Sequence, residues 1–313
     1  MADQAPDPNM FTLPFQLTKK MRRDVYPAVD PMQPELAAVA KGKVVMIVGA
    51  GGGIGFAVAK AWSLTSAKGI VLVGRNVSAL ESTARDIGAE SKVPILIVDG
   101  DITSAESVAS IFTKAIDKFG TVDTVVKAAG RSELAVAPVG QIEAESWWPN
   151  FEILVKGTFN LVSALSKATT AAGPNKTGTF VNVVSAAAAA ARPGMSSYGI
   201  AQLAATRLGE FVDLDCPHIR SFSLHPGIVA VENNRGGVVE MFTPFAKDKA
   251  MLTGGISLWL QKPEADFLRG GFFSVNWDVE EMLAHKEEIV EKRLVKLGFV
   301  GAELGPEGHP WGT

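Results

Sequence analysis

From about residue 41 onward, short apolar runs alternate with longer stretches whose apolar residues recur at helical spacing. Short runs that are rich in valine and isoleucine and bounded by glycine are typical of strands buried in a parallel sheet. We predict strands at 43–49, 69–74, 93–101, 121–130, 178–185 and 219–227. We predict helices at 55–65, 77–90, 104–120, 144–172 and from Ser196 onward. This alternation predicts an α/β fold, a doubly wound parallel sheet covered by helices on both faces.

The helix predicted at 104–120 has recognisable ends. Ser104 stands where a serine side chain accepts a backbone N–H of the first helical turn. Gly120 follows the apolar spacing, and glycine is the usual residue for ending a helix.

The two ends of the chain differ from this regular part. Residues 1–40 are rich in proline and predict an extended arm with at most short helices. We divide the chain into this arm, a single Rossmann-like domain at 41–300 and a tail at 301–313. The arm contains a cluster of basic residues, which consists of Lys19, Lys20, Arg22 and Arg23. We interpret this cluster as a face of the arm that is exposed to solvent.

Composition narrows the class of protein. The chain has 313 residues, is 47% hydrophobic and 20% charged, and carries a net charge of −3. These values indicate a soluble globular protein and give no reason to expect nucleic acid or a membrane as partner. The single cysteine, Cys216, excludes an intrachain disulfide and favours a reducing compartment, so we expect a cytoplasmic protein. We expect no metal ion.

A glycine-rich segment follows the first predicted strand and opens the first predicted helix. Gly49, Gly53 and Gly55 have the spacing Gly-x-x-x-Gly-x-Gly. Glycine allows the backbone to approach a ligand closely, and the helix N-terminus offers N–H groups to a pyrophosphate. This context favours a nucleotide site over the alternative, a tight turn without a ligand.

The end of the second predicted strand indicates which nucleotide binds. An NAD site usually has an acidic residue there for the ribose 2′-hydroxyl, whereas this chain has Gly74 followed by Arg75. A guanidinium matches the oxygens of a 2′-phosphate, so the sequence favours NADP(H). The alternative is a solvated Arg75 that begins a helix.

Further motifs follow in a characteristic order. They are Asp101 in "GDIT", Ala128 to Gly130 in "AAG", Ser185, Tyr198, and "HPGIV" after the sixth strand. With the glycine-rich turn, this order resembles the short-chain dehydrogenase/reductase family over about residues 41–299. The arm and the C-terminal segment look like a branch of that family common in filamentous fungi.

The resemblance implies a set of functional positions. The implied catalytic residues are Ser185, Tyr198 and Gln202. The implied cofactor-binding residues are Gly49, Gly53, Ile54, Gly55, Arg75, Asp101, Ala129, Gly130, Gln202, Pro226, Gly227 and Val229. The resemblance also implies a substrate lid at about 231–257 and a homodimer or homotetramer formed through the helices at 144–172 and after Ser196.

The proton relay that the family uses is incomplete in this chain. Ser185 and Tyr198 match the family's serine and tyrosine. The family's lysine, four residues after the tyrosine, is replaced by Gln202, its relay asparagine by Leu154, and the threonine after Pro-Gly by Val231. Without a neighbouring cation, Tyr198 is expected to keep a pKa of about 10, which disfavours oxidation more than reduction.

Several residues near the implied site allow two interpretations. Lys127 and Arg131 flank "AAG". They are either substitute cations for the site or, as we favour, a lysine at a strand end and an arginine in a solvated loop. We expect Trp147 and Trp148 to pack the long helix, and His225 to be a hydrogen-bonded structural residue rather than a base.

These observations leave three hypotheses about function. The first is an NADPH-dependent reductase of a hydrophobic small-molecule carbonyl or imine in secondary metabolism. The second is a non-redox catalyst, such as a cyclase, isomerase or dehydratase, that uses the same cleft. The third is a non-catalytic protein that binds NADP(H). The lid segment contains the apolar residues Met241, Phe242, Phe245 and Met251. These side chains suit contact with an apolar ligand, and they equally suit packing in the core of the lid itself.

Overall fold

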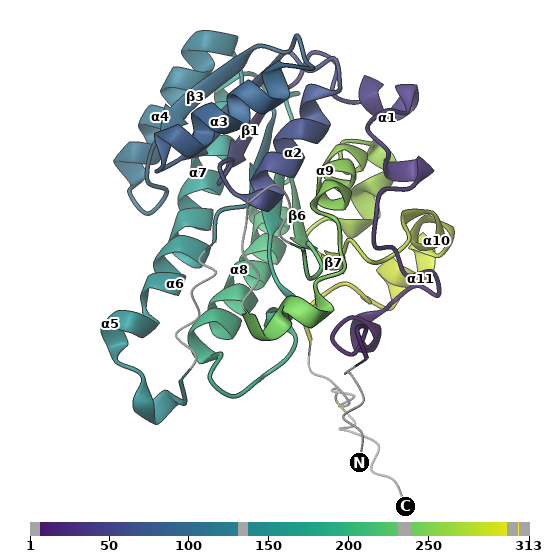
Figure 1. Cartoon of the computed structure of the whole chain (residues 1–313). Coiled ribbons are helices and arrows are strands. Elements are labelled where there is room, and N and C mark those ends of the chain that lie inside the picture. Colours follow the sequence, from purple (N-terminus) through teal and green to yellow (C-terminus); the bar gives the residue numbers. More distant parts are fainter. Residues whose placement is uncertain (1–6, 131–136, 231–239, 299–305, 307–313) are drawn as a thin grey trace, which may run out of the picture.

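The centre of the molecule is a parallel sheet of seven strands in the order β3-β2-β1-β4-β5-β6-β7 (Figure 1). This computed structural model describes residues 7–130, 137–230, 240–298 and 306. The strands are β1 (Val44–Val48), β2 (Gly69–Gly74), β3 (Ile95–Asp99), β4 (Thr124–Lys127), β5 (Gly178–Val183), β6 (Ile219–His225) and β7 (Phe272–Ser274). The predicted doubly wound α/β sheet is confirmed. Strand β7 was not predicted, because three residues are too few to show a pattern.

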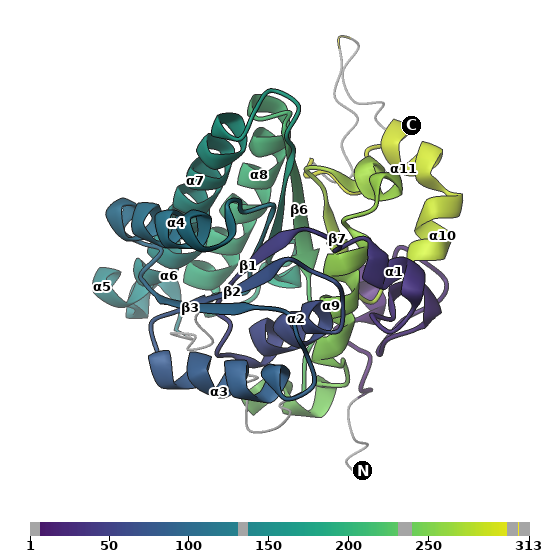
Figure 2. The same ribbon diagram turned by 90° about the horizontal axis from the view of Figure 1, so that it is seen from above.

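Helices cover both faces of the sheet. Figure 2 shows α4, α7 and α8 on one side and α2, α3 and α9 on the other. Their bounds are α2 (Gly53–Ser63), α3 (Val77–Gly88), α4 (Ala105–Phe119), α7 (Gly157–Ala171), α8 (Ser196–Asp215) and α9 (Ala250–Trp259). Central strands such as β1 are buried at every position, which explains their continuous apolar runs.

Helix α4 ends as its sequence predicted. The Ser104 side chain accepts the backbone N–H of Ser107 at 3.2 Å, which caps the first turn. Gly120 has a φ of +81°, a conformation that glycine adopts without steric cost.

The long helix predicted at 144–172 is interrupted. It consists of α5 (Ala144–Trp147), α6 (Pro149–Phe151), a π-helical segment η4 (Glu152–Lys156) and α7. Pro149 lacks the N–H that a continuous helix would need at its position, so one helix ends before it and another begins. The π segment adds a wider turn directly before α7, and such turns are frequent at functional sites.

Shorter elements complete the chain. The short α-helices are α1 (Pro34–Ala38), α10 (Val279–Ala284) and α11 (Lys286–Glu291). The 3-10 helices are η1 (Leu13–Phe15), η2 (Pro27–Val29), η3 (Val139–Gln141), η5 (Ala186–Ala188), η6 (Glu240–Phe245) and η7 (Pro263–Leu268). The arm therefore has the extended character with short helices that its prolines predicted.

The arm packs on the main domain rather than standing apart from it. Tyr26, Val29 and Leu36 are buried in the same apolar cluster as the residues of β1 and α9. The interpretation of the basic cluster as a solvated face was wrong for two of its members. Arg22 pairs with Asp278 and Arg23 with Asp248, and both carboxylates are fully buried.

Candidate active site

The turn between β1 and α2 requires glycine for steric reasons. Gly49 has a φ of +86°, and a Cβ there would lie 2.7 Å from the backbone nitrogen of Ala129. A Cβ on Gly51 would lie 2.8 Å from the Cβ of Ala79. No side chain caps the N-terminus of α2. The turn therefore brings backbone close to its surroundings and presents an uncapped helix end, the arrangement that holds a phosphate group.

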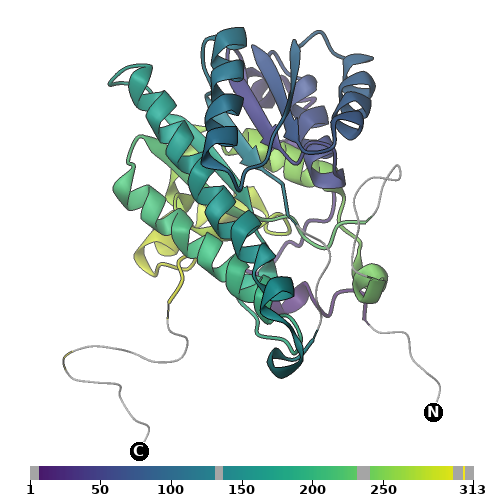
Figure 3. The same cartoon turned by 90° about the vertical axis from the view of Figure 1, so that its left-hand side faces the viewer.

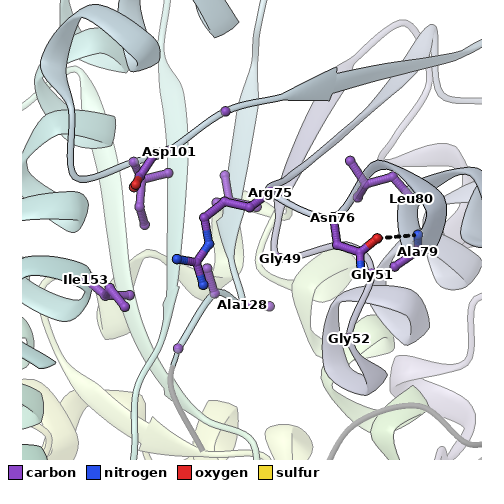
Figure 4. A pocket seen from close by; sticks show the side chains of 16 residues that line it. Gly49, Gly51, Gly52, Arg75, Asn76, Ala79, Leu80, Asp101, Ala128 and Ile153 are labelled. Carbon is purple, nitrogen blue, oxygen red and sulfur yellow. Dashed lines mark hydrogen bonds between the residues drawn. The ribbon is translucent and has the colours of Figure 1, made fainter. Parts of the chain in front are cut away.

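A cavity of about 410 Å³ opens in front of this turn, at the carboxyl ends of β1 to β4 (Figure 4). Its lining contains five of the residues predicted to bind the cofactor, namely Gly49, Arg75, Asp101, Ala129 and Gly130. The lining also contains Gly51, Gly52 and Asn76, which the sequence analysis did not select. The consecutive glycines were the available signal for the first two.

The other seven predicted cofactor residues, Gln202 among them, do not line this cavity. Gly53, Ile54 and Gly55 lie in the first turn of α2. A Cβ on Gly55 would lie 2.2 Å from the carbonyl oxygen of Gly49, so this glycine allows the helix to pack against the turn. Pro226, Gly227 and Val229 lie after β6, outside the cavity.

Arg75 and Asp101 place opposite charges at the cavity. Figure 4 shows the Arg75 side chain directed across the cavity toward Ala128, with Asp101 on the facing wall. The pKa of the Asp101 carboxyl is lowered, first by the Thr103 backbone N–H that it accepts at 2.9 Å and further by the charge of Arg75. The cavity thus has a cation where the sequence predicted a phosphate partner.

Ser185, Tyr198 and Gln202 lie close together at the same end of the sheet as the cavity. Ser185 follows β5 and accepts the backbone N–H of Ala187, while Tyr198 and Gln202 lie one turn apart at the start of α8. Side-chain hydrogen bonds join the Tyr198 hydroxyl to Ser185 and Gln202. Gln202 is buried, and its Oε1 has no partner among the described residues, so its amide N–H makes the contact with Tyr198.

The proton affinity of Tyr198 differs from the sequence expectation. Burial raises the pKa of its hydroxyl above the ordinary value of about 10, and the hydrogen bonds with Ser185 and Gln202 counter only part of this effect. The expectation of an unshifted pKa was therefore wrong. Tyr198 is a protonated donor over the whole physiological pH range.

His225 supports the loop that carries Ser185. Its Nδ1 accepts the backbone N–H of Ala186 at 3.2 Å, and burial lowers its pKa to about 4. A neutral imidazole that accepts a backbone N–H matches the predicted structural role. The ring also stacks with Phe272 of β7 at an interplanar angle of 14°.

Lys127 is the main departure from the sequence analysis. Its side chain is 0% exposed, its Nζ has no hydrogen-bond partner among the described residues, and burial lowers its pKa to about 7. Asn182 and Ser223 lie in register with it on β5 and β6, and both have buried polar atoms without a partner in the described part of the chain. Lys127 is the last residue of β4, as the favoured interpretation of a lysine at a strand end has it, but its full burial was not predicted. Arg131 lies outside the described residues.

Of the positions where this chain replaces a residue of the family's relay, the structure describes Leu154 but not Val231. Leu154 lies in the π segment, is 1% exposed and lies near Gly130, so the relay asparagine's position is apolar and closed. Val231 lies outside the described residues, as does the lid segment up to residue 239. Trp147 and Trp148 both stack on Phe151, as expected for helix packing, although Trp148 is 55% exposed.

Among the described residues, no cluster of histidine, cysteine, aspartate and glutamate has metal-binding geometry. Within the same part of the chain, every helix is too short or too polar to cross a lipid bilayer. The site combines two features. One is a cavity that contains Arg75 and is suited to a phosphate group, and the other is the neutral Tyr198 hydroxyl, which is hydrogen-bonded to Ser185 and Gln202.

Comparison with known proteins agrees with this arrangement. A family model described as short chain dehydrogenase matches residues 43–237. A short chain dehydrogenase of Monascus purpureus is 31% identical over 294 residues, covering 91% of this chain and 97% of that protein. A short chain dehydrogenase/reductase of Claviceps purpurea is 30% identical over 267 residues, covering 83% of this chain and 87% of that protein.

Solved structures agree on the fold. A putative short chain dehydrogenase from Pseudomonas syringae has a TM-score of 0.68 at 22% identity, with 78% of this chain and 97% of that chain covered. An NAD⁺-bound xylitol dehydrogenase has a TM-score of 0.64 at 24% identity, with 75% of this chain and 98% of that chain covered.

Proposed function

Because the chain belongs to the short-chain dehydrogenase family, we propose that it is an NADPH-dependent reductase of a hydrophobic carbonyl or imine in secondary metabolism. The observation that carries this proposal is the Tyr198 hydroxyl, which is hydrogen-bonded to Ser185 and held protonated by burial. A protonated hydroxyl at the carboxyl end of the sheet is suited to donate a proton to a substrate oxygen or nitrogen that becomes basic on reduction.

The residues present fit a nicotinamide dinucleotide. The turn at 49–52 and the uncapped start of α2 would hold the pyrophosphate, and Arg75 would hold a 2′-phosphate. Gln202 would hold the ribose next to the nicotinamide, and the loop at 226–229 would hold the carboxamide. When bound, this cofactor supplies the hydride.

The chain's own residues would then handle the substrate oxygen and the proton. Ser185 would donate a hydrogen bond to the carbonyl oxygen and fix its position beside Tyr198. Tyr198 would donate its proton to that oxygen as negative charge develops there. Gln202 carries no charge to stabilise the resulting tyrosinate, so the reverse reaction, which needs tyrosinate at the start, is disfavoured.

A non-redox reaction in the same cleft is the second candidate. It is favoured by the buried Leu154, which places an apolar side chain where the family's relay water would lie. A cyclisation or dehydration would need a shaped cleft and one neutral donor, and the Tyr198 hydroxyl is such a donor. Stoichiometric loss of NADPH absorbance during turnover would establish reduction, whereas product formation without NADPH loss would establish the second candidate.

We expect the protein to bind NADPH more tightly than NADH, because Arg75 lines the cavity where an acidic residue would favour NADH. Changing Arg75→Ala should raise the Kd for NADPH roughly 10- to 100-fold, the range expected for a lost charged hydrogen bond, and leave the Kd for NADH unchanged. Fluorescence titration measures both. Arg85→Ala, on the exposed face of α3, is the matched control. Tighter binding of NADH by the unaltered protein would disprove the assignment.

We also propose that two or four copies assemble through α7 and α8, in a cytoplasm that keeps Cys216 reduced. These helices expose a set of large apolar side chains, namely Phe159, Ile200, Leu203, Phe211 and Leu214. The members on α8 recur at helical spacing and so form one stripe, which a second copy of the same helix would cover.

Introducing a charge into this stripe should separate the copies. We expect Phe211→Glu to give a particle near the chain mass of 33.1 kDa by light scattering, while the unaltered protein gives a multiple of it. Val290→Glu on α11, where the valine is 57% exposed, is the control that should leave the assembly intact. A monomeric unaltered protein at micromolar concentration would rule out the assembly.

A further inference from the structure

In the N-terminal arm, the aromatic side chain of Phe11 packs against the lid segment. The ring of Phe11 lies edge-on to Phe242 at 5.3 Å and to Phe245 at 4.6 Å between ring centroids. Both partners belong to η6, in the segment that follows β6 and its Pro-Gly loop. Edge-to-face pairs at these distances stabilise a defined arrangement of rings, so Phe11 is part of the lid's packing.

The same ring also contacts the loop that carries the catalytic pair. The guanidinium of Arg192 lies 4.2 Å from the centroid of Phe11. Arg192 stands between Ser185 and Tyr198, 192 − 185 = 7 residues after the first and 198 − 192 = 6 residues before the second. Phe11 therefore lies between the lid and the loop of the proton donor. Figures 1 and 3 show the purple arm, the green η6 and the start of α8 at the same end of the molecule.

Hydrogen bonds on both sides of Phe11 hold the arm in place. On one side, the Trp277 indole N–H donates to the Phe15 carbonyl at 2.7 Å. On the other, Arg23 donates to Asn9 at 2.6 Å and to Asp248 at 2.9 Å. A segment fixed at these points keeps its aromatic ring at one position without help from a ligand.

The carboxylate that anchors the arm also fixes the loop after Gly227. Asp248 is fully buried and accepts the backbone N–H of Ile228 at 2.6 Å. Gly227 has a φ of +77°, and a Cβ there would lie 2.3 Å from the Asp248 carboxylate. Through Arg23 and Asp248, the arm is joined to the same loop that we assign to the cofactor carboxamide.

We propose that the arm forms the outer wall of the substrate site and that Phe11 is a specificity-determining residue for an apolar substrate. This proposal rests on the proposed function, because it takes the substrate to lie beside Ser185 and Tyr198. Phe11 packs against Phe242 and Phe245 on the lid side and against Arg192 on the side of the proton donor. The substrate class that fits is a ketone or imine whose apolar group extends toward the arm.

Two substitutions at position 11 should shift substrate size preference in opposite directions. We expect Phe11→Ala to raise kcat/KM for the largest members of a series of aryl alkyl ketones relative to the smallest by about tenfold, mainly through KM. Phe11→Trp should shift the ratio toward the smallest members. NADPH affinity should stay unchanged in both. Leu13→Ala is the control, because this arm residue is 50% exposed. An active Phe11→Ala variant with an unchanged ratio overturns the proposal.

Hydrogen exchange separates this proposal from the proposed function. In the Phe11→Ala variant, exchange should increase in residues 186–195 and in 240–245 together, and Leu13→Ala should change neither segment. An increase confined to 240–245 would overturn the role of the arm as a bridge. If the unaltered protein reduces no ketone, the reductase is rejected. In that case, calorimetry measures the Kd of each ketone in the unaltered protein and in Phe11→Ala. A changed ratio between the Kd values of the largest and smallest ketones supports the arm as the wall of the site, and an unchanged ratio overturns it.

Discussion

The double variant Gln202→Lys with Leu154→Asn is expected to reduce a generic diketone with NADPH at least about tenfold faster than the unaltered protein. The expectation follows from the Tyr198 hydroxyl, whose pKa is raised by burial and which has an uncharged neighbour in Gln202. A lysine at position 202 would place a cation beside that hydroxyl and lower its pKa toward the working pH. General acid catalysis is most effective there, and its usual contribution is about 10²- to 10⁴-fold.

Both changes are needed because the site is closed around them. Gln202 is 3% exposed and Leu154 is 1% exposed. A lone lysine would be a buried charge without a partner, which is costly, whereas an asparagine at 154 offers a polar group and room for water. Gln202→Lys alone should therefore gain less than the double variant.

The pH profile distinguishes a repaired relay from a general effect on folding. In the double variant, the rate of reduction should begin to fall at a lower alkaline pH than in the unaltered protein, because Tyr198 loses its proton earlier. Gln202→Met, of similar size and without a charge or hydrogen bond, is the control and should not gain activity. A double variant that binds NADPH normally but remains inactive would show that the cleft no longer supports hydride transfer.

Lys127→Met is expected to remove most of the increase in stability that the protein gains between pH 7 and about pH 10. Burial lowers the pKa of Lys127 to about 7, whereas an unfolded lysine has a pKa of about 10.4. Below pH 7 the group is protonated in both states, so the full cost of burying the charge is present. Between the two pKa values the folded state has released the proton and the unfolded state still binds it.

The sign of the pH dependence follows from this difference in bound protons. Because the unfolded state binds more protons, the free energy of unfolding rises with pH, by up to about 1.4 kcal/mol per pH unit. Urea denaturation at several pH values measures the slope in both proteins, and the difference isolates Lys127 from other groups. Lys118→Met, on the exposed face of α4, should keep the slope of the unaltered protein.

The same experiment tests whether the lysine is truly without a partner. Lys127→Met should also be the more stable protein at pH 7 and below, since a methionine of similar length carries no charge into the sheet. Equal slopes for the two proteins would mean that Lys127 keeps its proton in the folded state up to its ordinary pKa. Asn182 and Ser223, which are in register with it, would then be expected to accept hydrogen bonds from the ammonium, because their polar atoms are also buried without partners among the described residues.

Local sequence determined most of the fold and the first half of the candidate site. Strands β1 to β6 coincide with the six apolar runs from which we predicted them. Helix α4 has its own capping residues in Ser104 and Gly120. These signals act between residues a few positions apart, so they are readable without the rest of the chain. The turn at Gly49 is of the same kind. The order of Ser185 and Tyr198 along the chain led us to propose them as a catalytic pair, and the structure places both at one end of the sheet.

The tertiary structure decided which charges are buried and which segments meet. Lys127 ends the apolar strand β4 and looks like an ordinary strand-end lysine, but the packing of the domain buries its side chain completely. Arg23 looks like part of a solvated cluster, yet its partner Asp248 is 225 residues away. Phe11 meets η6 and Arg192 only because the chain folds back on itself. Burial and long-range pairing depend on packing between distant segments, and no local pattern of residues encodes them.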